Sequence, residues 1–327
     1  MIYISVILIS FLLTWVVKYI AIKKSIIDIP NDRSSHATPT PRGGGLAVVA
    51  AFFIGLTYCF FIGQIDKSLF YALLSGIPLT LIGLADDIVS LKPGVRFLVQ
   101  FICAGLALFF LGGLQFLQLG ACNLKIIWLF TPVAFIAIIW SINLFNFLDG
   151  IDGYIGSEII FLGLGIFLLT GDNIGILLAT SVGGFLIWNW PKAKIFMGDV
   201  GSTFLGFAIA IIAIHHQNTH VASMSVWLIL TSVFWFDATL TIFRRTNNKE
   251  KLSQAHKKHA FQRIVQAGWS HQSVVFGAFL LNLMGFGLAW LSKEFTNFSL
   301  VFLGIDILVL FIVLKWIDRK KPFDYLG

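Results

Sequence analysis

Apolar runs of about 17 to 22 residues recur along the whole chain and are separated by short polar connections. An α-helix of that length can cross a hydrocarbon core of about 30 Å. The pattern predicts an all-α, polytopic integral membrane protein with about eleven transmembrane helices, forming a single domain over residues 1–327. The expected spans cover roughly residues 2–22, 44–63, 69–85, 96–112, 126–148, 154–170, 174–190, 203–219, 224–243, 272–292 and 299–317.

The first run is predicted to be a span rather than a signal peptide, because it is long and lacks early positive charge and a small-residue cleavage site. Composition agrees with a membrane protein, since 57% of the 327 residues are apolar and only 12% are charged. Cys59 and Cys103 lie in apolar spans and Cys122 in an outer loop, so neither a disulfide nor a cysteine metal site is expected.

The distribution of charge predicts the orientation. Threading the spans alternately through a bilayer puts 20 of the 23 Lys and Arg residues on one face and only Lys67, Lys125 and Lys293 on the other. The positive-inside rule makes the first face cytoplasmic, with the amino terminus outside and the carboxyl terminus inside. This rule and anionic membrane lipids account for the net charge of +7, so no nucleic-acid partner is inferred.

Carboxylates gather on the same face, which indicates chemistry at the cytoplasmic membrane boundary. Only three of them, Glu158, Asp237 and Asp306, fall within predicted spans.

Four polar residues follow one another at intervals of three where the span 126–148 ends: Asn143, Asn146, Asp149 and Asp152. Residues three apart are neighbours on one helix face, so these side chains could line a cup for a polar ligand. A polar helix end that only reaches water is the simpler alternative.

Adjacent carboxylates, Asp86 and Asp87, close the span 69–85. Such a pair can hold Mg²⁺ or take a proton from an acidic nucleophile. The alternative is a solvated loop in which Lys92 and Arg96 balance the two charges.

Glycines mark two further connections. Arg42 precedes three glycines at the start of the span 44–63, where they could serve helix packing or could hold an anion together with Arg42. Asp199 lies between Gly198 and Gly201, where it could cap a helix or bind a hard cation. Phe196, just before, could face lipid or stack on a nucleotide base.

Histidines and cations alternate in the long connection 244–272, where His256 and His259 flank two lysines and Arg263 follows. Cations repel a metal ion and attract phosphate, so phosphate binding is favoured over a zinc site. A basic amphipathic helix on anionic lipid is the alternative.

Together, these motifs resemble the polyprenyl-phosphate N-acetylhexosamine-1-phosphate transferases of glycosyl transferase family 4. The resemblance runs from Pro39 to about Gly268 and is carried in order by PRGGG, the Asp86–Asp87 pair, NLFNFLDGIDG, FMGDVGS and HKKH. It implies an enzyme of the bacterial inner membrane whose active site faces the cytoplasm. Such an enzyme transfers an N-acetylhexosamine 1-phosphate from a UDP-sugar to undecaprenyl phosphate and releases UMP. This is a first membrane step of O-antigen or other cell-envelope polysaccharide synthesis.

The resemblance also implies roles for individual residues. Asp199 would be the principal ligand of Mg²⁺, or of Mn²⁺ as an alternative, with Asn146 as a second ligand. Phe196 would stack on uracil and Asp152 would bind the edge of that base. Asn143 and Asp149 would line the nucleotide cup. Asp86 and Asp87 would engage or deprotonate the lipid phosphate. The substrate phosphates would be bound by His256, His259, Arg263, Lys92 and Arg42.

Two departures from the family pattern stand out. Many members have Lys where this chain has Ser90, so Lys92 is expected to substitute, and the HKKH sequence replaces a run of histidines. The second variant resembles the subgroup that starts O-antigen chains with N-acetylfucosamine or N-acetylquinovosamine.

Attack on the donor by the lipid phosphate, with Asp86 or Asp87 as the base, is the expected mechanism, and a covalent phosphoryl-aspartate is the alternative. A secondary transporter would instead need Glu158, Asp237 or Asp306 near the membrane midplane. A non-catalytic scaffold would tolerate Asp199→Asn. A homodimer is left open.

Overall fold

The computed structural model describes residues 2–30, 38–89, 91–252, 254 and 256–323. Its long helices are α1 (Ile2–Lys23), α2 (Gly45–Phe61), α4 (Ile77–Val89), α5 (Pro93–Leu111), α6 (Ile127–Leu148), α7 (Tyr154–Thr170), α8 (Asn173–Asn189), α9 (Asp199–Asn218), α11 (Ser232–Asn247), α13 (His271–Glu294) and α14 (Ser299–Lys320). Shorter elements are the helices α3 (Lys67–Leu74), α10 (Met224–Leu230), α12 (Ala260–Gln266) and η1 (Thr296–Phe298), and the strands β1 (Ile27–Asp28), β2 (Thr40–Pro41), β3 (Leu117–Leu119) and β4 (Cys122–Leu124).

All of the expected spans are helical, which confirms an all-α polytopic membrane protein. Within the described residues, seven helical segments are long and apolar enough to cross a membrane by length and composition, and eight if the bent pair α10–α11 is one span. The expected number of eleven also counted α2, α7 and α8, which are apolar but have only 17 residues each.

Two expected spans are interrupted. The segment predicted as 69–85 consists of α3 and α4, which are separated at Ser75 and Gly76. The segment predicted as 224–243 consists of α10 and α11, whose axes differ by 78° across Thr231. This bend turns α11 away from the line of α10 and brings Ile242 to the wall of the site cavity described below.

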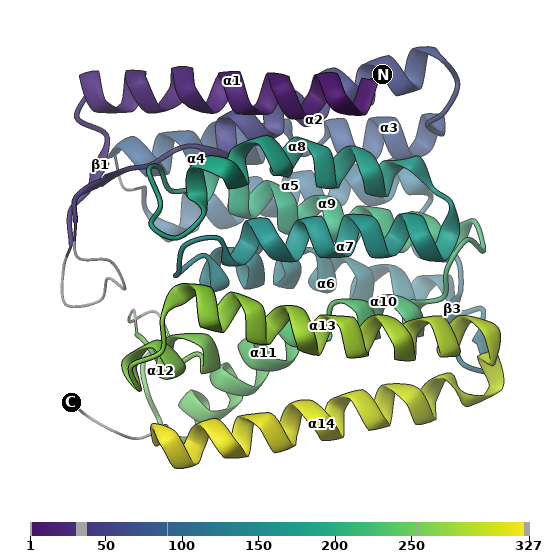
Figure 1. Cartoon of the computed structure of the whole chain (residues 1–327). Coiled ribbons are helices and arrows are strands. Elements are labelled where there is room, and N and C mark those ends of the chain that lie inside the picture. Colours follow the sequence, from purple (N-terminus) through teal and green to yellow (C-terminus); the bar gives the residue numbers. More distant parts are fainter. Residues whose placement is uncertain (1, 31–37, 90, 253, 255, 324–327) are drawn as a thin grey trace.

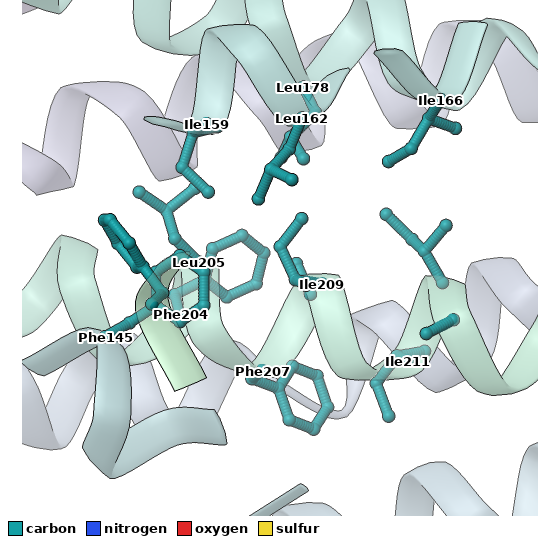
Figure 2. Packing of buried hydrophobic residues seen from close by; sticks show 14 of the residues in the cluster. Phe145, Ile159, Leu162, Ile166, Leu178, Phe204, Leu205, Phe207, Ile209 and Ile211 are labelled. Atoms are coloured by element: carbon teal, nitrogen blue, oxygen red, sulfur yellow. The ribbon is translucent and has the colours of Figure 1, made fainter. Parts of the chain in front are cut away.

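The helices lie side by side in one bundle, with α1 and α14 at opposite margins (Figure 1). Helix α9 is the central element, because 89% of its most apolar stretch is buried inside the protein, against 22% for α1. Leu205 and Ile209 of α9 face Ile159 and Leu162 of α7, as Figure 2 shows. The first residue of this buried helix is Asp199, so the central helix positions the expected metal ligand.

Close helix packing depends on small residues, as expected where lipid supplies no hydrophobic driving force between helices. A Cβ atom at Gly184 of α8 would lie 2.3 Å from the carbonyl oxygen of Ile7 in α1. A Cβ atom at Gly163 of α7 would lie 2.4 Å from the carbonyl oxygen of Gly175 in α8. Glycine therefore sets the spacing of α1, α8 and α7.

The two ends of the bundle differ in character. Strand β1, helix α12 and the C-terminal end of α14 lie at one end, and the beginning of α1 lies at the other, with β3 (Figure 1). The beginning of α1 and the end of α14 thus lie at opposite ends of the bundle (Figure 1). The motif-bearing connections share the end that carries α12.

Candidate active site

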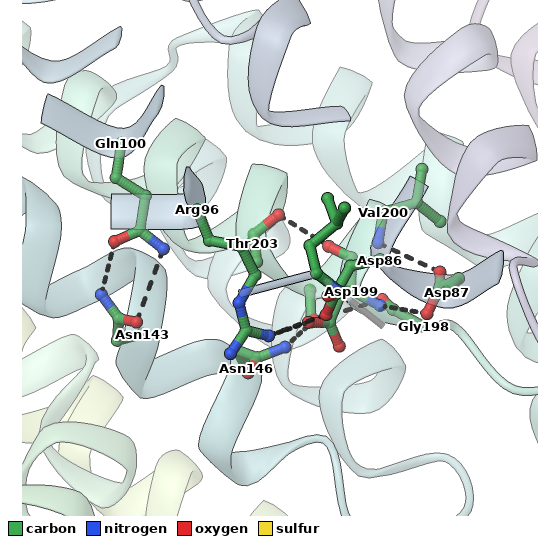
Figure 3. A network of polar contacts seen from close by, with 12 residues as sticks. Asp86, Asp87, Arg96, Gln100, Asn143, Asn146, Gly198, Asp199, Val200 and Thr203 are labelled. Carbon is green, nitrogen blue, oxygen red and sulfur yellow. Dashed lines mark hydrogen bonds and ion pairs between the residues drawn. The ribbon is translucent and has the colours of Figure 1, made fainter. Parts of the chain in front are cut away.

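Three carboxylates meet at the start of α9. Arg96, on the first turn of α5, places its Nη1 atom 2.7 Å from Asp86 Oδ2 and 3.1 Å from Asp199 Oδ2 (Figure 3). One guanidinium thus bridges the end of α4 and the beginning of α9. Without that charge the two carboxylates would repel each other, so Arg96 makes their close approach possible.

Asp87 is buried and holds the same junction from the other side. Its Oδ1 atom accepts a hydrogen bond from the Asp199 amide at 3.2 Å, and its Oδ2 atom accepts one from the Val200 amide at 3.4 Å. Arg42 donates from Nε and Nη2 to the Asp87 carbonyl oxygen, at 2.9 and 2.5 Å. Asp87 therefore fixes the first turn of α9, and with it the Asp199 side chain.

Gly198 is required by this geometry. Its backbone has φ +77° and ψ 171°, a combination essentially restricted to glycine. A Cβ atom there would lie 2.4 Å from Asp87 Oδ2. Gly45 and Gly201 are also in contact, since a Cβ atom on Gly45 would lie 2.3 Å from the Gly201 Cα atom.

The PRGGG segment pairs with the loop that leads to Asp199. The amides of Gly44 and Gly45 donate to the carbonyl oxygens of Phe196 and Met197 at 2.9 and 2.8 Å. The Phe196 amide donates to the Pro41 carbonyl oxygen at 2.8 Å. Of the two interpretations of these glycines, close packing is the one that the contacts support, because the amides of Gly44 and Gly45 already have partners.

The polar face of α6 turns toward the same place. The Asn146 amide group hydrogen-bonds to the Asp199 carboxylate and lies 3.3 Å from Ser202 Oγ. Asn143 Nδ2 donates to Gln100 Oε1 of α5 at 2.8 Å (Figure 3). The interval of three residues therefore does place both amides on one face of the helix.

Asp149 and Asp152 follow the end of α6. Burial, and then the neighbouring Asp199 and Asp87 carboxylates, raise the pKa of Asp149 to about 8, although the Gly198 amide donates to its carboxylate. Asp152 Oδ2 accepts a hydrogen bond from the Ala193 amide at 3.1 Å and lies 3.3 Å from His271 Nδ1. Asp152 thus contacts the loop that leads to Phe196.

A cavity of about 540 Å³ opens beside Asp199. Its polar lining comes from Arg96, Gln100, Asn143, Asn146, Asp199 and Thr203. Apolar side chains from α4, α5, α6 and α11, with Leu252, form the rest, among them Phe97, Trp140 and Ile242. The cavity is therefore polar at the carboxylate cluster and apolar elsewhere.

Two of the expected substrate-binding residues, Phe196 and Lys92, are not part of the cavity lining. Phe196 is half-buried in the loop that pairs with PRGGG. Lys92 is exposed at the position just before α5, and Arg96, four residues on, is the cation that contacts the acids. The departure at Ser90 falls outside the described residues.

The histidine loop has partners of its own. The Lys258 amide donates to His256 Nδ1 at 3.1 Å. Burial, and then the nearby His259 and Arg245, lower the pKa of His256 to about 3, so this imidazole is neutral at pH 7 and carries its proton on Nε2. His259 Nδ1 lies 3.8 Å from Asp237 Oδ1. Arg263 Nη1 lies 2.7 Å from Asp318 Oδ1 in α14.

The donor set at Asp199 suits a hard divalent cation. The described residues contain no group of three or more His, Cys, Asp or Glu side chains placed to hold a metal, which argues against an all-protein cage. Mg²⁺ commonly takes one or two carboxylates and completes its shell with water and substrate phosphates. The Asp199 carboxylate fits that mode, whereas Asn146 faces it with its Nδ2 donor and would offer its oxygen to a cation only after the amide turns over.

Sequence reasoning did not single out Arg96 or Gln100 as site residues. The sequence indicates Arg96 only as a charge that balances a loop, and Gln100 lies in an apolar run, where a single amide gives little local signal. Of the carboxylates predicted within spans, Glu158 pairs with Asn282 Nδ2 at 2.5 Å and Asp237 contacts α12. These contacts are within the protein and do not favour an ion-coupled transporter.

Comparison with known proteins gives a consistent picture. Residues 69–217 match the family model described as "Glycosyl transferase family 4". A Bacillus subtilis protein named "Probable undecaprenyl-phosphate N-acetylglucosaminyl 1-phosphate transferase" is 30% identical, over 95% of this chain and 91% of its own length. A Thermotoga maritima protein named "Undecaprenyl-phosphate alpha-N-acetylglucosaminyl 1-phosphate transferase" is 29% identical, over 85% of this chain and 87% of its own. The "Decaprenyl-phosphate N-acetylglucosaminephosphotransferase" of Mycobacterium tuberculosis is 27% identical, over 86% of this chain and 80% of its own.

Proposed function

The chain belongs to glycosyl transferase family 4, and we propose that it transfers an N-acetylhexosamine 1-phosphate from a UDP-sugar to undecaprenyl phosphate, releasing UMP. It is a membrane enzyme of the polyprenyl-phosphate sugar-1-phosphate transferase type. The observation that carries the detailed proposal is the cluster of Asp86, Asp87 and Asp199, which adjoins a largely apolar cavity through Arg96.

The cavity suits an acceptor that has an anionic head and a long hydrocarbon tail. The tail would lie against Phe97, Trp140 and Ile242, and the phosphate head would reach Arg96 and the carboxylates. A site at the membrane boundary is required because the acceptor remains in the bilayer while the nucleotide is soluble. We place this boundary at the cytoplasmic face of a bacterial inner membrane, as the distribution of Lys and Arg suggests.

The chemistry requires two anions to approach each other. An oxygen of the lipid phosphate attacks the β-phosphorus of the donor, the bond from that phosphorus to the bridging oxygen breaks, and UMP leaves. Asp86, which lies beside Arg96 and Asp199, takes the proton of the lipid phosphate where that phosphate is still protonated. Asp87 supports the reaction indirectly, because it holds the first turn of α9.

Mg²⁺ or Mn²⁺, held by Asp199 and Asn146, would supply positive charge to offset the phosphates of the donor. On the protein side, Arg96 supplies positive charge next to the same carboxylates. His256 would donate from Nε2 as a neutral imidazole to a phosphate oxygen. Asn143, Asp149, Asp152 and Phe196 would hold the nucleotide, with Phe196 stacked on uracil.

The test is a transfer assay. Purified protein is incubated with undecaprenyl phosphate, Mg²⁺ and each of several UDP-N-acetylhexosamines, and UMP is measured. UDP-N-acetylglucosamine is the first choice, because the relatives are named for that sugar. We expect UMP only when donor and lipid are both present, and absence of UMP with every donor would reject the proposal.

The covalent alternative has its own test. Protein is incubated with a donor labelled at the β-phosphate, without lipid, and is then denatured. Direct attack predicts no label on the protein, whereas a labelled phospho-enzyme would replace direct attack by the two-step route.

A further inference from the structure

Asp237 is a buried carboxylate within α11, outside the motifs named above. It is 7% exposed, and its helix forms with α10 a bent pair that is apolar enough to span a membrane. A carboxylate in such surroundings is costly unless hydrogen-bond donors satisfy it. Its side chain therefore calls for a specific partner.

The partner is the beginning of α12. The Ala260 amide donates to both oxygens of Asp237, at 2.9 and 3.0 Å, and Thr241 Oγ1 donates to Oδ1 at 3.1 Å. His259 is the residue that precedes α12, and its Nδ1 atom lies 3.8 Å from Asp237 Oδ1. One carboxylate thus faces the peptide amide and the imidazole that together begin α12.

Helix α12 in turn packs on the motif that follows α6. The Phe261 ring stacks on Tyr154 with the ring centroids 4.9 Å apart. A Cβ atom at Gly150 would lie 3.0 Å from Phe261 Cζ, so α12 touches the turn between Asp149 and Asp152. The His256 and His259 rings are 5.0 Å apart, and Leu252, earlier in the same loop, lines the site cavity.

We propose that Asp237 is a positioning residue for the transfer reaction: by anchoring Ala260 and orienting His259, it holds the 256–259 loop at the phosphate end of the site. The proposal rests on the proposed function. Asp237 thereby has a structural role in the enzyme, whereas from the sequence alone it could equally be an essential acid of a transporter. The 78° bend between α10 and α11 brings this acid to α12 instead of continuing the line of α10.

The test compares Asp237→Asn and Asp237→Ala with Asp306→Asn. Asp306 is the matched control, because it is also a buried carboxylate in a membrane helix, at 1% exposure, and it lies on α14 without a contact to α12 among those described. Each variant is first checked for an unchanged melting temperature and a monodisperse elution profile in detergent.

Two readouts follow. Hydrogen exchange of peptides that cover residues 256–266 should become about tenfold faster in Asp237→Ala and unchanged in Asp306→Asn. The kcat should fall by about tenfold in Asp237→Asn and about a hundredfold in Asp237→Ala, the size of loss that a displacement of about 1 Å can cause. The KM for each substrate should stay within about twofold, because groups that act in the transition state affect kcat first.

The proposal is overturned if both Asp237 variants keep wild-type exchange and wild-type kcat, or if Asp306→Asn lowers kcat to the same extent. Should Asp237→Ala fail to fold, Asp237→Asn decides alone. If the wild type itself released no UMP, the proposed function would be wrong, while the exchange measurement would still report whether Asp237 anchors α12.

Discussion

Replacing Gly198 by alanine gives a sharp test of the site geometry. The added Cβ atom would lie 2.4 Å from Asp87 Oδ2, and ordinary contact begins at 3.4 Å, so the carboxylate or the loop must move by about 1 Å. Alanine must also adopt φ +77°, which costs about 1–3 kcal/mol. Displacing the carboxyl group from the Asp199 and Val200 amides removes two hydrogen bonds, each worth about 0.5–1.5 kcal/mol.

The hydrogen bonds are 3.2 and 3.4 Å long, so only part of that value applies, and the expected loss of unfolding free energy is about 2–5 kcal/mol. Because Asp199 is the first residue of the displaced helical turn, kcat should also fall by about a hundredfold. The control is Gly183→Ala in α8, where a Cβ atom meets nothing within 4 Å and the backbone is helical.

The assay combines thermal unfolding in detergent with UMP release. We expect Gly183→Ala to behave as wild type and Gly198→Ala to lose both stability and activity. Equal melting temperatures and equal kcat for the two variants would refute the assignment of Asp87 as the residue that fixes the start of α9.

Two further predictions concern the segment around α12. Asp318 accepts hydrogen bonds from Arg244 at 2.9 and 3.0 Å and from Arg263 at 2.7 Å, so Asp318→Asn should lower the unfolding free energy by about 1–3 kcal/mol, while Arg319→Gln, an exposed control, should not. A smaller effect for Asp318→Asn than for Arg319→Gln would contradict this. The low pKa of His256, about 3 against about 6.5 in an unfolded chain, means that only the unfolded state takes up a proton on this imidazole as the pH falls from 7 to 5. The contribution of His256 to stability should therefore be complete above pH 6.5 and fall by about 1–2 kcal/mol by pH 5, and His256→Gln should flatten this dependence in melting curves recorded across that range.

The spans were predictable because a continuous apolar run of about 20 residues, as a helix, matches the thickness of the hydrocarbon core of a bilayer. Their interruptions were not. No proline or glycine lies at the bend at Thr231, and beyond the bend α11 packs against α6 and α14. The three 17-residue helices α2, α7 and α8 show the limit of counting spans from apolar length alone.

The proximity of some predicted site residues followed from the sequence, and their contacts did so less. Asp199 and Asn146 lie together as expected, because their motifs begin or end helices at the same end of the bundle. Pairing of Gly44 with Phe196 joins segments more than a hundred residues apart, which no local pattern encodes. Nor could the sequence show which cation, Arg96 or Lys92, contacts the acids. Only the first helical turn of α5 places Arg96 between Asp86 and Asp199.

The central claim is that phosphoryl transfer takes place at Asp199, and the most direct measurement is the formation of labelled lipid by Asp199→Asn. Wild-type protein and Asp66→Asn, which alters a helix cap on α3 away from the carboxylate cluster, are assayed beside it with a donor labelled in the sugar. We predict labelled polyprenyl product from both of these proteins and none above background from Asp199→Asn at an unchanged melting temperature. Product formation by Asp199→Asn at the wild-type rate would contradict the account.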